Sequence, residues 1–554
     1  MAKLRFSALA LGMCAALSVS AFHVGGDNGV DIHGSVQTDM LFPEEDETIG
    51  TGTYDKKFLS NSYADINMIS RYVDAGVRVE FMKWPLPGFE PDFNGWGVPH
   101  IYVKGRFKGF ELTLGDFYEQ FGSGFILRTY QERSLGIDNS LRGARLKYNG
   151  VRGLRLTALG GLQRRYWDWS RHSQVYGGEA EFGIQEYSSR LRDAGVNWTV
   201  GASYVLKHEQ DQDIMVPGTD FRLNLPKNVS AFDLRTHFQK RNFGILGEFA
   251  WKSQDPSFDN NYTYGKGTAV MLSGSYSRSG MSALLQAKRS ENFSFRSQRD
   301  MAGTSVFINN MPAFAYQHTY ALAALYPYAT QAAPGEWAFQ GSFAYTFKRR
   351  TALGGRYGTK LKFNASYIRG LQHRGSDAGI NGSQYGTDGT KTKFFEMGAN
   401  YYHDFNVQIE KRLTSSFQMA FMYMNQMYNK TVIEGHGGEI KANIFILDAK
   451  QKFDKRFTLR GELQYLTTRQ DQKDWAYGLL ELSVAPYLMF SVSDMWNCGD
   501  TKVHYYMFGV AGNYRSNRLM VSYGRTRAGF NCSGGVCRYV PASRGIQLAY
   551  SYNF

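Results

Sequence analysis

Apolar and polar side chains alternate with a period of two along many short segments of this chain. The last segment places five apolar or aromatic residues on one face: Ile546, Leu548, Tyr550, Tyr552 and Phe554. The opposite face carries small or polar residues: Gln547, Ala549, Ser551 and Asn553. Similar runs lie at 361–367 and 457–465, and others begin near residues 77, 101, 154 and 395. Because successive side chains of a strand point to opposite sides, this pattern predicts β-strands with one apolar face.

Short and long connections alternate between these predicted strands. Short turns are expected at 516–517, 485–486, 453–455, 279–280, 241–242, 149–150 and 108–109. Longer connections are expected at roughly 530–542, 371–389, 294–334, 209–227, 117–140, 84–97 and 42–60. Long outer loops and short periplasmic turns are typical of a transmembrane antiparallel β-barrel. The spacing predicts an all-β barrel of about 24 strands, with 18 to 26 allowed because strand boundaries shift easily.

Composition separates this barrel from a soluble sandwich, whose strands also alternate. The chain has 36 Tyr and 39 Phe among 554 residues, yet its mean hydropathy is −0.40. After the N-terminus, no apolar run approaches the roughly 18 residues that a membrane-spanning helix needs. A barrel combines these properties, because alternate residues face lipid and lumen.

The N-terminus predicts export. Lys3 and Arg5 precede an apolar run from Phe6 to Leu17 and then small residues, as in a secretory signal peptide over 1–21 with cleavage near Ala21. Cys14 suggests a lipoprotein alternative, which the residue before it, Met13, disfavours. Residues 22–554 then form one barrel domain. The final Phe554 resembles the C-terminal signal read by the barrel assembly machinery, so we expect the cell outer membrane of a Gram-negative bacterium, with its lipid as partner.

The segment 115–148 contains the candidate constriction. It joins two strands at their outer ends but carries six large apolar residues: Phe117, Tyr118, Phe121, Phe125, Ile126 and Leu127. Folding into the lumen would explain them. The residues expected to line or brace a constriction are Tyr118, Glu119, Arg128, Glu132, Arg133, Asp138 and Arg142. If these residues line the constriction, Arg128 helps to set the ion preference of the channel. In the alternative, the charges form a salt-bridge network that only holds the loop in place.

A second outer connection, 294–334, is also rich in apolar residues between 306 and 330. It is interpreted either as a further lumen-folded plug or as a docking surface for a partner protein at the cell surface.

Charge is spread along the chain, with a formal net value of +14. Strand parity places eight basic residues in the lumen: Arg78, Lys104, Arg106, Arg155, Arg235, Lys252, Lys362 and Arg460. Parity opposes them with five acidic ones: Glu80, Asp233, Glu248, Glu396 and Glu462. Either they form ion-paired packing, or their excess creates a field that favours anionic solutes. The clustered basic stripe of a nucleic-acid binder is absent from the sequence, so no nucleic-acid partner is expected.

Three cysteines, Cys498, Cys532 and Cys537, fall in predicted outer loops on an oxidising export route. Cys532 and Cys537 flank SGGV, whose glycines allow the chain to reverse, so this pair is the predicted disulfide. Replacement of one member by Cys498 is the alternative.

Sequence motifs for chemistry are lacking. The histidines form no HExxH or HxxxH spacing, and no serine-containing elbow occurs. We therefore expect no enzyme, no catalytic residue, no cofactor and no metal site. The acidic run at 44–47 lacks the spacing of a calcium loop and is interpreted as solvated charge.

Three stretches carry a resemblance to a known family: 115–148, HTYALAALYPYATQ at 318–331 and CSGGVCRYVPASRG at 532–545. They resemble a family of uncharacterised Bacteroidota outer-membrane barrels designated only as a domain of unknown function. The resemblance implies the fold and the location, and supplies no substrate or site residue. More loosely, a strand, a Gly-rich loop and the Arg142–Gly143 pair are similar to alginate-export-type porins, which adds a little weight to anion transport.

These observations predict a porin-like channel that passes small solutes, anions among them. A barrel that conducts nothing and scaffolds a surface or secretion complex is the alternative. An apolar segment 306–330 that stayed outside the lumen would favour the scaffold.

Overall fold

A computed structural model describes residues 22–24, 29–169, 172–375, 382–533 and 536–554. The predicted signal peptide at 1–21, including the cleavage position near Ala21, lies outside these residues.

Twenty-four strands form one closed antiparallel barrel. Its first half comprises β2 (Val30–Pro43), β3 (Leu59–Ile69), β4 (Val73–Met82), β5 (Gly95–Phe107), β6 (Phe110–Phe117), β9 (Leu141–Tyr148), β10 (Leu154–Arg165), β12 (Ser173–Gly183), β13 (Val196–Glu209), β14 (Asn228–Lys240), β15 (Phe243–Lys252) and β16 (Gly267–Arg278). Its second half comprises β17 (Met281–Glu291), β18 (Glu336–Phe347), β19 (Thr359–Arg374), β20 (Lys391–Arg412), β21 (Phe417–Asn429), β22 (Glu439–Lys452), β23 (Phe457–Thr468), β24 (Trp475–Val484), β25 (Leu488–Asn497), β26 (His504–Tyr514), β27 (Asn517–Thr526) and β30 (Ser543–Asn553).

Small elements decorate this wall. They are the strands β1 (Phe22–Val24), β7 (Gln131–Glu132), β8 (Ile137–Asp138), β11 (Asp168–Trp169), β28 (Gly529–Ser533) and β29 (Val536–Val540), the short helices α2 (Ser189–Asp193) and α3 (Lys430–Glu434), and single 3-10 turns at Glu47–Ile49, Pro91–Phe93, Arg133–Leu135, Ile184–Glu186 and Phe258–Asn260. Within the described part of the chain, none of the helices is long and apolar enough to cross a membrane.

Pairing of β2 with β30 closes the barrel. Their antiparallel register runs from Ser35 opposite Asn553 to Pro43 opposite Gly545. The amide of Phe554 donates to the carbonyl of Gly34 at 2.9 Å, and the amide of Gly34 donates back at the same distance. The predicted fold class, an antiparallel barrel of about 24 strands, is confirmed.

The wall presents apolar side chains outward, as the alternation predicts. On β23, Leu463 and Tyr465 are 64% and 43% exposed on the outside, whereas Glu462 and Gln464 face inward and are 4% exposed each. The same parity holds on β19, where Phe363 faces outward and Asn364 is buried in the lumen. This apolar outer face is what a hydrocarbon environment requires.

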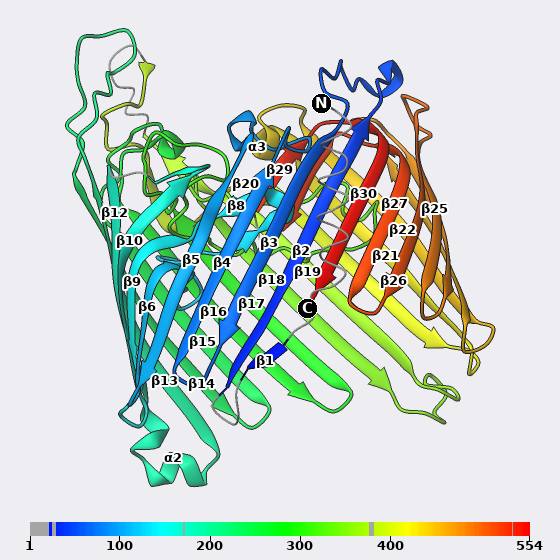
Figure 1. Ribbon diagram of the computed structural model, residues 1–554, viewed down its shortest axis with the longest axis horizontal. Coiled ribbons are helices and arrows are strands. Elements are labelled where there is room, and N and C mark those ends of the chain that lie inside the picture. Colours follow the sequence, from blue (N-terminus) through cyan, green and yellow to red (C-terminus); the bar gives the residue numbers. More distant parts are fainter. Residues whose placement is uncertain (1–21, 25–28, 170–171, 376–381, 534–535) are drawn as a thin grey trace.

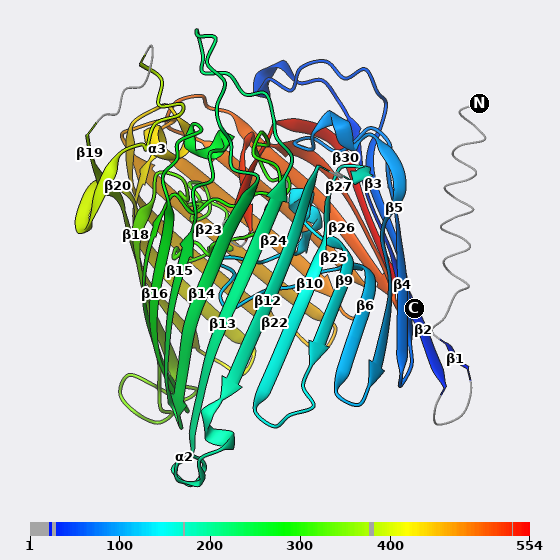
Figure 2. The ribbon, with the colours of Figure 1, turned by 90° about the vertical axis from the view of Figure 1, so that its left-hand side faces the viewer.

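Long and short connections lie at opposite ends of the barrel (Figure 1). The seven predicted short turns each coincide with a junction between barrel strands, and the seven predicted long connections lie at the other end. Two connections at the short-turn end are longer than expected, 184–195 and 348–358, and the first contains α2, which projects below the barrel (Figure 2). The end with the long connections is therefore the outer end.

The first testable consequence concerns migration in SDS gels. A barrel closed by hydrogen bonds resists detergent until it is boiled, because opening it exposes unpaired backbone groups. We expect the protein to fractionate with outer membranes and to migrate faster unboiled than boiled. Recovery in the soluble periplasm, or one mobility under both conditions, would contradict this.

Candidate functional site

The outer half of the lumen is occupied by two connections, which we call the first inner loop (residues 118–140) and the second inner loop (residues 292–335). Both run inside the wall near the outer end (Figure 1). They emerge between neighbouring strands, β6 and β9 for the first and β17 and β18 for the second.

The second inner loop crosses the whole lumen. On one side, the Gln163 side chain of β10 donates to the carbonyl of Phe307 at 2.8 Å. On the other side, the amide of Leu322 donates to Gln464 of β23 at 2.8 Å. In the ring of 24 strands, β10 and β23 are half a circumference apart. A single loop that contacts both must span the barrel.

The first inner loop contacts another sector of the wall and the second loop. Arg133 forms an ion pair with Asp65 of β3 at 2.7 Å, while the amide of Ser123 donates to Glu248 of β15 at 3.1 Å. The amide of Arg128 donates to the carbonyl of Ile308 in the second loop at 2.8 Å. Together the two loops reach most of the circumference.

An apolar core holds the loops together. The first loop contributes Phe121, Phe125, Ile126 and Leu127, and the second contributes Phe293, Phe295, Ile308 and Leu322, all at most 1% exposed. Tyr326 and Tyr328 of the second loop pack against Tyr428 and Tyr402 of the wall. Burying each large apolar side chain contributes about 1.5–3 kcal/mol. The two loops and this part of the wall thus share one apolar core.

The wall also contributes apolar side chains to this core. The sequence pattern that indicates them was not recognised in the sequence analysis. On β21 and β22, inward-facing Met422, Met424, Ile444 and Ile446 are buried although their neighbours already face lipid. The runs FMYM at 421–424 and IFIL at 444–447 are apolar on both faces. A strand that is apolar on both faces indicates lumen filled by protein at that height.

Two of the predicted constriction residues, Tyr118 and Asp138, belong to a buried ion-pair network. The Tyr118 hydroxyl donates to Asp138 at 3.0 Å, and Arg164 of β10 pairs with Asp138 at 2.9 Å. Arg78 of β4 also contacts Asp138 and pairs with Glu80 at 2.8 Å. Burial alone would raise the pKa of the Asp138 carboxyl, but Arg164 and Arg78 lower it well below its ordinary value. The network fastens the first inner loop to the wall.

Four other constriction residues also make local bracing contacts. Glu119 pairs with Arg145 at 3.1 Å and with Lys147 at 2.6 Å on β9. Arg142 pairs with Asp116 at 2.8 Å, and Glu132 accepts from the hydroxyl of Ser134 at 2.7 Å. Arg133, whose pair with Asp65 is given above, completes the set. These contacts favour the pinning interpretation over a charged lining.

Arg128 differs from the other six. Its guanidinium lies 5.3 Å from the ring of Tyr130, and it makes no ion pair with any residue that the structure describes. It is half-buried. The partners considered for it in the sequence, Glu119 and Glu132, are engaged elsewhere.

Lumen-facing charges along the wall are mostly neutralised in pairs. Each of the eight basic residues assigned to the lumen by parity forms an ion pair, with carboxylates of the wall or of the loops. Three lysines are fully buried where the wall meets the loops: Lys207, Lys252 and Lys288. Of these, Lys288 pairs with Glu336 at 2.9 Å and donates to the carbonyl of Pro312 at 2.6 Å.

The acidic run at 44–47, expected to be solvated, is partly buried. Asp46 is 6% exposed and pairs with Arg525 at 2.6 Å. The connection that contains Asp46 therefore packs against β27.

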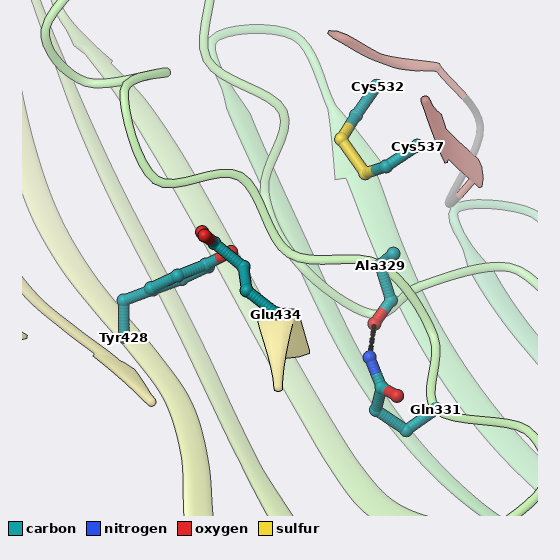
Figure 3. The surroundings of a disulfide bond; sticks show 6 residues. All are labelled: Ala329, Gln331, Tyr428, Glu434, Cys532 and Cys537. Carbon is teal, nitrogen blue, oxygen red and sulfur yellow. Dashed lines mark hydrogen bonds between the residues drawn. A yellow bond between two sulfur atoms is a disulfide. The ribbon is translucent and has the colours of Figure 1, made fainter. Parts of the chain in front are cut away.

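The hairpin of β28 and β29 lies near the second inner loop, because Val536 and Cys537 line a cavity together with Phe307 of that loop. Cys532 and Cys537 are register partners and form a disulfide (Figure 3). The Cys498 thiol is free. Arg538 donates to the carbonyl of Leu135 at 2.8 Å and stacks on Phe89 at 3.8 Å, so the hairpin also holds the first loop.

Below the loops, the inner half of the lumen contains a half-open cavity of about 550 Å³ bounded by β18 to β23, by the 348–358 connection and by Tyr320. Within the described residues, the structure contains no cluster of His, Cys, Asp or Glu that could hold a metal ion.

A closed antiparallel wall, an apolar outer face and outer loops folded into the lumen define a transmembrane β-barrel with a filled outer mouth. The chain belongs to the family of unknown function DUF6029, whose model matches residues 3–554. No curated protein matches it.

Several solved barrels are similar in architecture. The P pilus usher PapC translocation pore is 9% identical with a TM-score of 0.39, covering 95% of this chain and 98% of its own. OccAB3 of Acinetobacter baumannii is 9% identical with a TM-score of 0.36, covering 95% and 99%. The ferric enterobactin receptor PfeA of Pseudomonas aeruginosa, in complex with enterobactin, is 8% identical with a TM-score of 0.43, covering 94% and 81%. At such values, none of them identifies a function for this chain.

The ion-pair network predicts a large effect of Asp138→Asn. Arg78 and Arg164 would keep only Glu80 as a buried counter-charge, which costs about 3–5 kcal/mol. Chymotrypsin cleavage within the first inner loop of the folded barrel should then accelerate by roughly a hundredfold or more, since about 1.4 kcal/mol corresponds to tenfold. Arg128→Gln is the matched control, because it also removes one charge from this loop, and it should change cleavage little. Equal cleavage of the two variants would refute the bracing role.

The disulfide is tested by mass spectrometry. Trypsin should release residues 528–538 as one peptide containing both Cys532 and Cys537. Without reduction this peptide should be lighter by two hydrogen atoms than after reduction. A cross-link from either cysteine to Cys498, or two free thiols, would contradict the pairing.

Proposed function

We propose that the protein is an outer-membrane channel for small solutes with a preference for anions, in a Gram-negative bacterium of the Bacteroidota. In the conformation described, the two inner loops close its outer mouth. The observation that carries the proposal is the apolar core that spans the lumen from β10 to β23 while the inner half retains a polar cavity. The loops then act as a gate.

The points at which the loops join the wall favour a movable gate over a plug that stays in the lumen. Ser290 of β17 and Glu336 of β18 are register partners, so the second loop leaves and re-enters the wall between adjacent strands. Phe117 of β6 and Leu141 of β9 are likewise partners around the first loop. Either loop can therefore leave the lumen without breaking a hydrogen bond between two strands of the wall. Contacts between loop and wall must break, and these set the cost of opening.

The scaffold alternative is less well supported. It called for an apolar segment 306–330 outside the lumen, free to dock a partner protein. In the structure this segment supplies Ile308 and Leu322 to the lumen core, both fully buried. Its apolar residues are therefore used within the barrel.

Replacing residues 293–334 by a short Gly/Ser turn tests the proposal. The flanking strands already pair, so the wall should still close, while the diameter-spanning loop is gone. In planar bilayers we expect rare openings of the wild type and stable conductance of the variant. The reversal potential in a salt gradient should indicate anion preference.

The matched control shortens the outer connection between β13 and β14, residues 211–224, which projects above the barrel (Figure 2), to a turn of the same composition. It should conduct as rarely as the wild type. A 293–334 variant that folds, as judged by heat-modifiable migration, but conducts nothing would favour the scaffold.

A further inference from the structure

We infer that the cavity in the inner half of the lumen is a binding site for small oxyanions of the phosphate type, formed chiefly by Lys360 and Lys450. A role of this site in transport rests on the proposed function. The binding of an oxyanion is argued from the geometry of the cavity alone. The cavity of about 550 Å³ lies within the roughly 300–1,000 Å³ typical of small-molecule pockets.

Register shows how four neighbouring strands form the hollow. Lys360 on β19 is opposite Glu410, Glu410 is opposite Ala420, and Ala420 is opposite Asp448 on β22. Ala420 is small, so the row between Lys360 and Asp448 is recessed at its centre. One pair further toward the inner end, Gln418 on β21 separates Arg412 from Lys450.

All of these side chains face the lumen. They share the strand parity of Ser366 and Gln464, whose side chains bind the amides of Tyr316 and Leu322 in the second inner loop. Tyr320 of the same loop lines the cavity from above, and its hydroxyl donates to Asp448 at 3.4 Å. The loop that closes the outer mouth therefore also covers this site.

The charge balance of the cavity is positive. Of its two carboxylates, Asp448 pairs with Arg460 at 3.0 Å, and Glu410 pairs with Lys362. Lys360 and Lys450 form no ion pair with any described residue, although both line the cavity. Two lysine side chains thus line one half-open cavity whose two carboxylates are already paired.

This arrangement matches an oxyanion better than a cation or a neutral solute. Lysine ammonium groups are donors without acceptor capacity, and they bind phosphate oxygens as point charges. The side-chain amide of Gln418, between them, can donate as well. Elsewhere in the lumen, basic side chains such as Lys288 and Arg164 already form ion pairs with carboxylates of the protein. The attraction is stronger in the partly enclosed lumen than in bulk water.

Calorimetric titration of the purified full-length barrel in neutral detergent with inorganic phosphate tests the inference. We expect saturable binding by the wild type and at least about a tenfold loss of affinity in Lys360→Gln/Lys450→Gln, because two charge-assisted contacts disappear. Lys360→Arg/Lys450→Arg should retain binding, since both positive donors remain. Heat-modifiable migration of each variant shows that it is folded.

Lys56→Gln/Lys266→Gln is the control for net charge, because both lysines lie in outer connections. It should bind phosphate as the wild type does. Absence of saturable binding by the wild type, or equal affinity losses in the lumen and outer-loop variants, would overturn the site. The titration needs no open pore, so a failure of the 293–334 variant to conduct would count against the channel and leave the binding site intact.

Discussion

Closure of the sheet is the constraint on which the rest of the structure depends. In hydrocarbon, no water satisfies an unpaired strand edge, so β2 and β30 must meet and every wall strand must have two neighbours. A ring of 24 strands encloses a lumen too wide for the wall side chains alone to fill. That space must hold either water or additional chain. In this protein the outer half holds chain and the inner half keeps a cavity.

Filling the outer half imposes two further requirements on the sequence. The loops must bring their own apolar surface, and the wall must offer a matching inner face, as Ile444 and Ile446 do. Charged groups trapped between loop and wall must also be paired, since a buried charge without a partner is costly. Asp138 between Arg78 and Arg164 meets this condition. Apolar packing thus supplies the attraction, while paired charges fix where each loop lies.

Local features of the fold could be predicted from the sequence, and long-range ones could not. Strand parity and turn positions follow from neighbouring residues, so the barrel and its strand number were predictable. The aromatic content of 115–148 indicated a loop with buried side chains. The partners of its charges were not predictable, because Asp138 contacts residues of β4 and β10, which lie four strands apart in the wall and are joined only through the folded loop. The cavity residues Lys360 and Lys450 were missed for the same reason, since their lack of partners depends on pairs formed by other strands.

Hydrogen exchange of backbone amides in the second inner loop tests most directly whether packed chain closes the outer half of the lumen. The amides of Ile308 and Leu322 are bonded inside the core, to Phe295 and Gln464 respectively. They should exchange as slowly as amides of the wall strands and far more slowly than those of the outer connection 210–227. Exchange of the second inner loop at the rate of that outer connection would contradict a closed mouth.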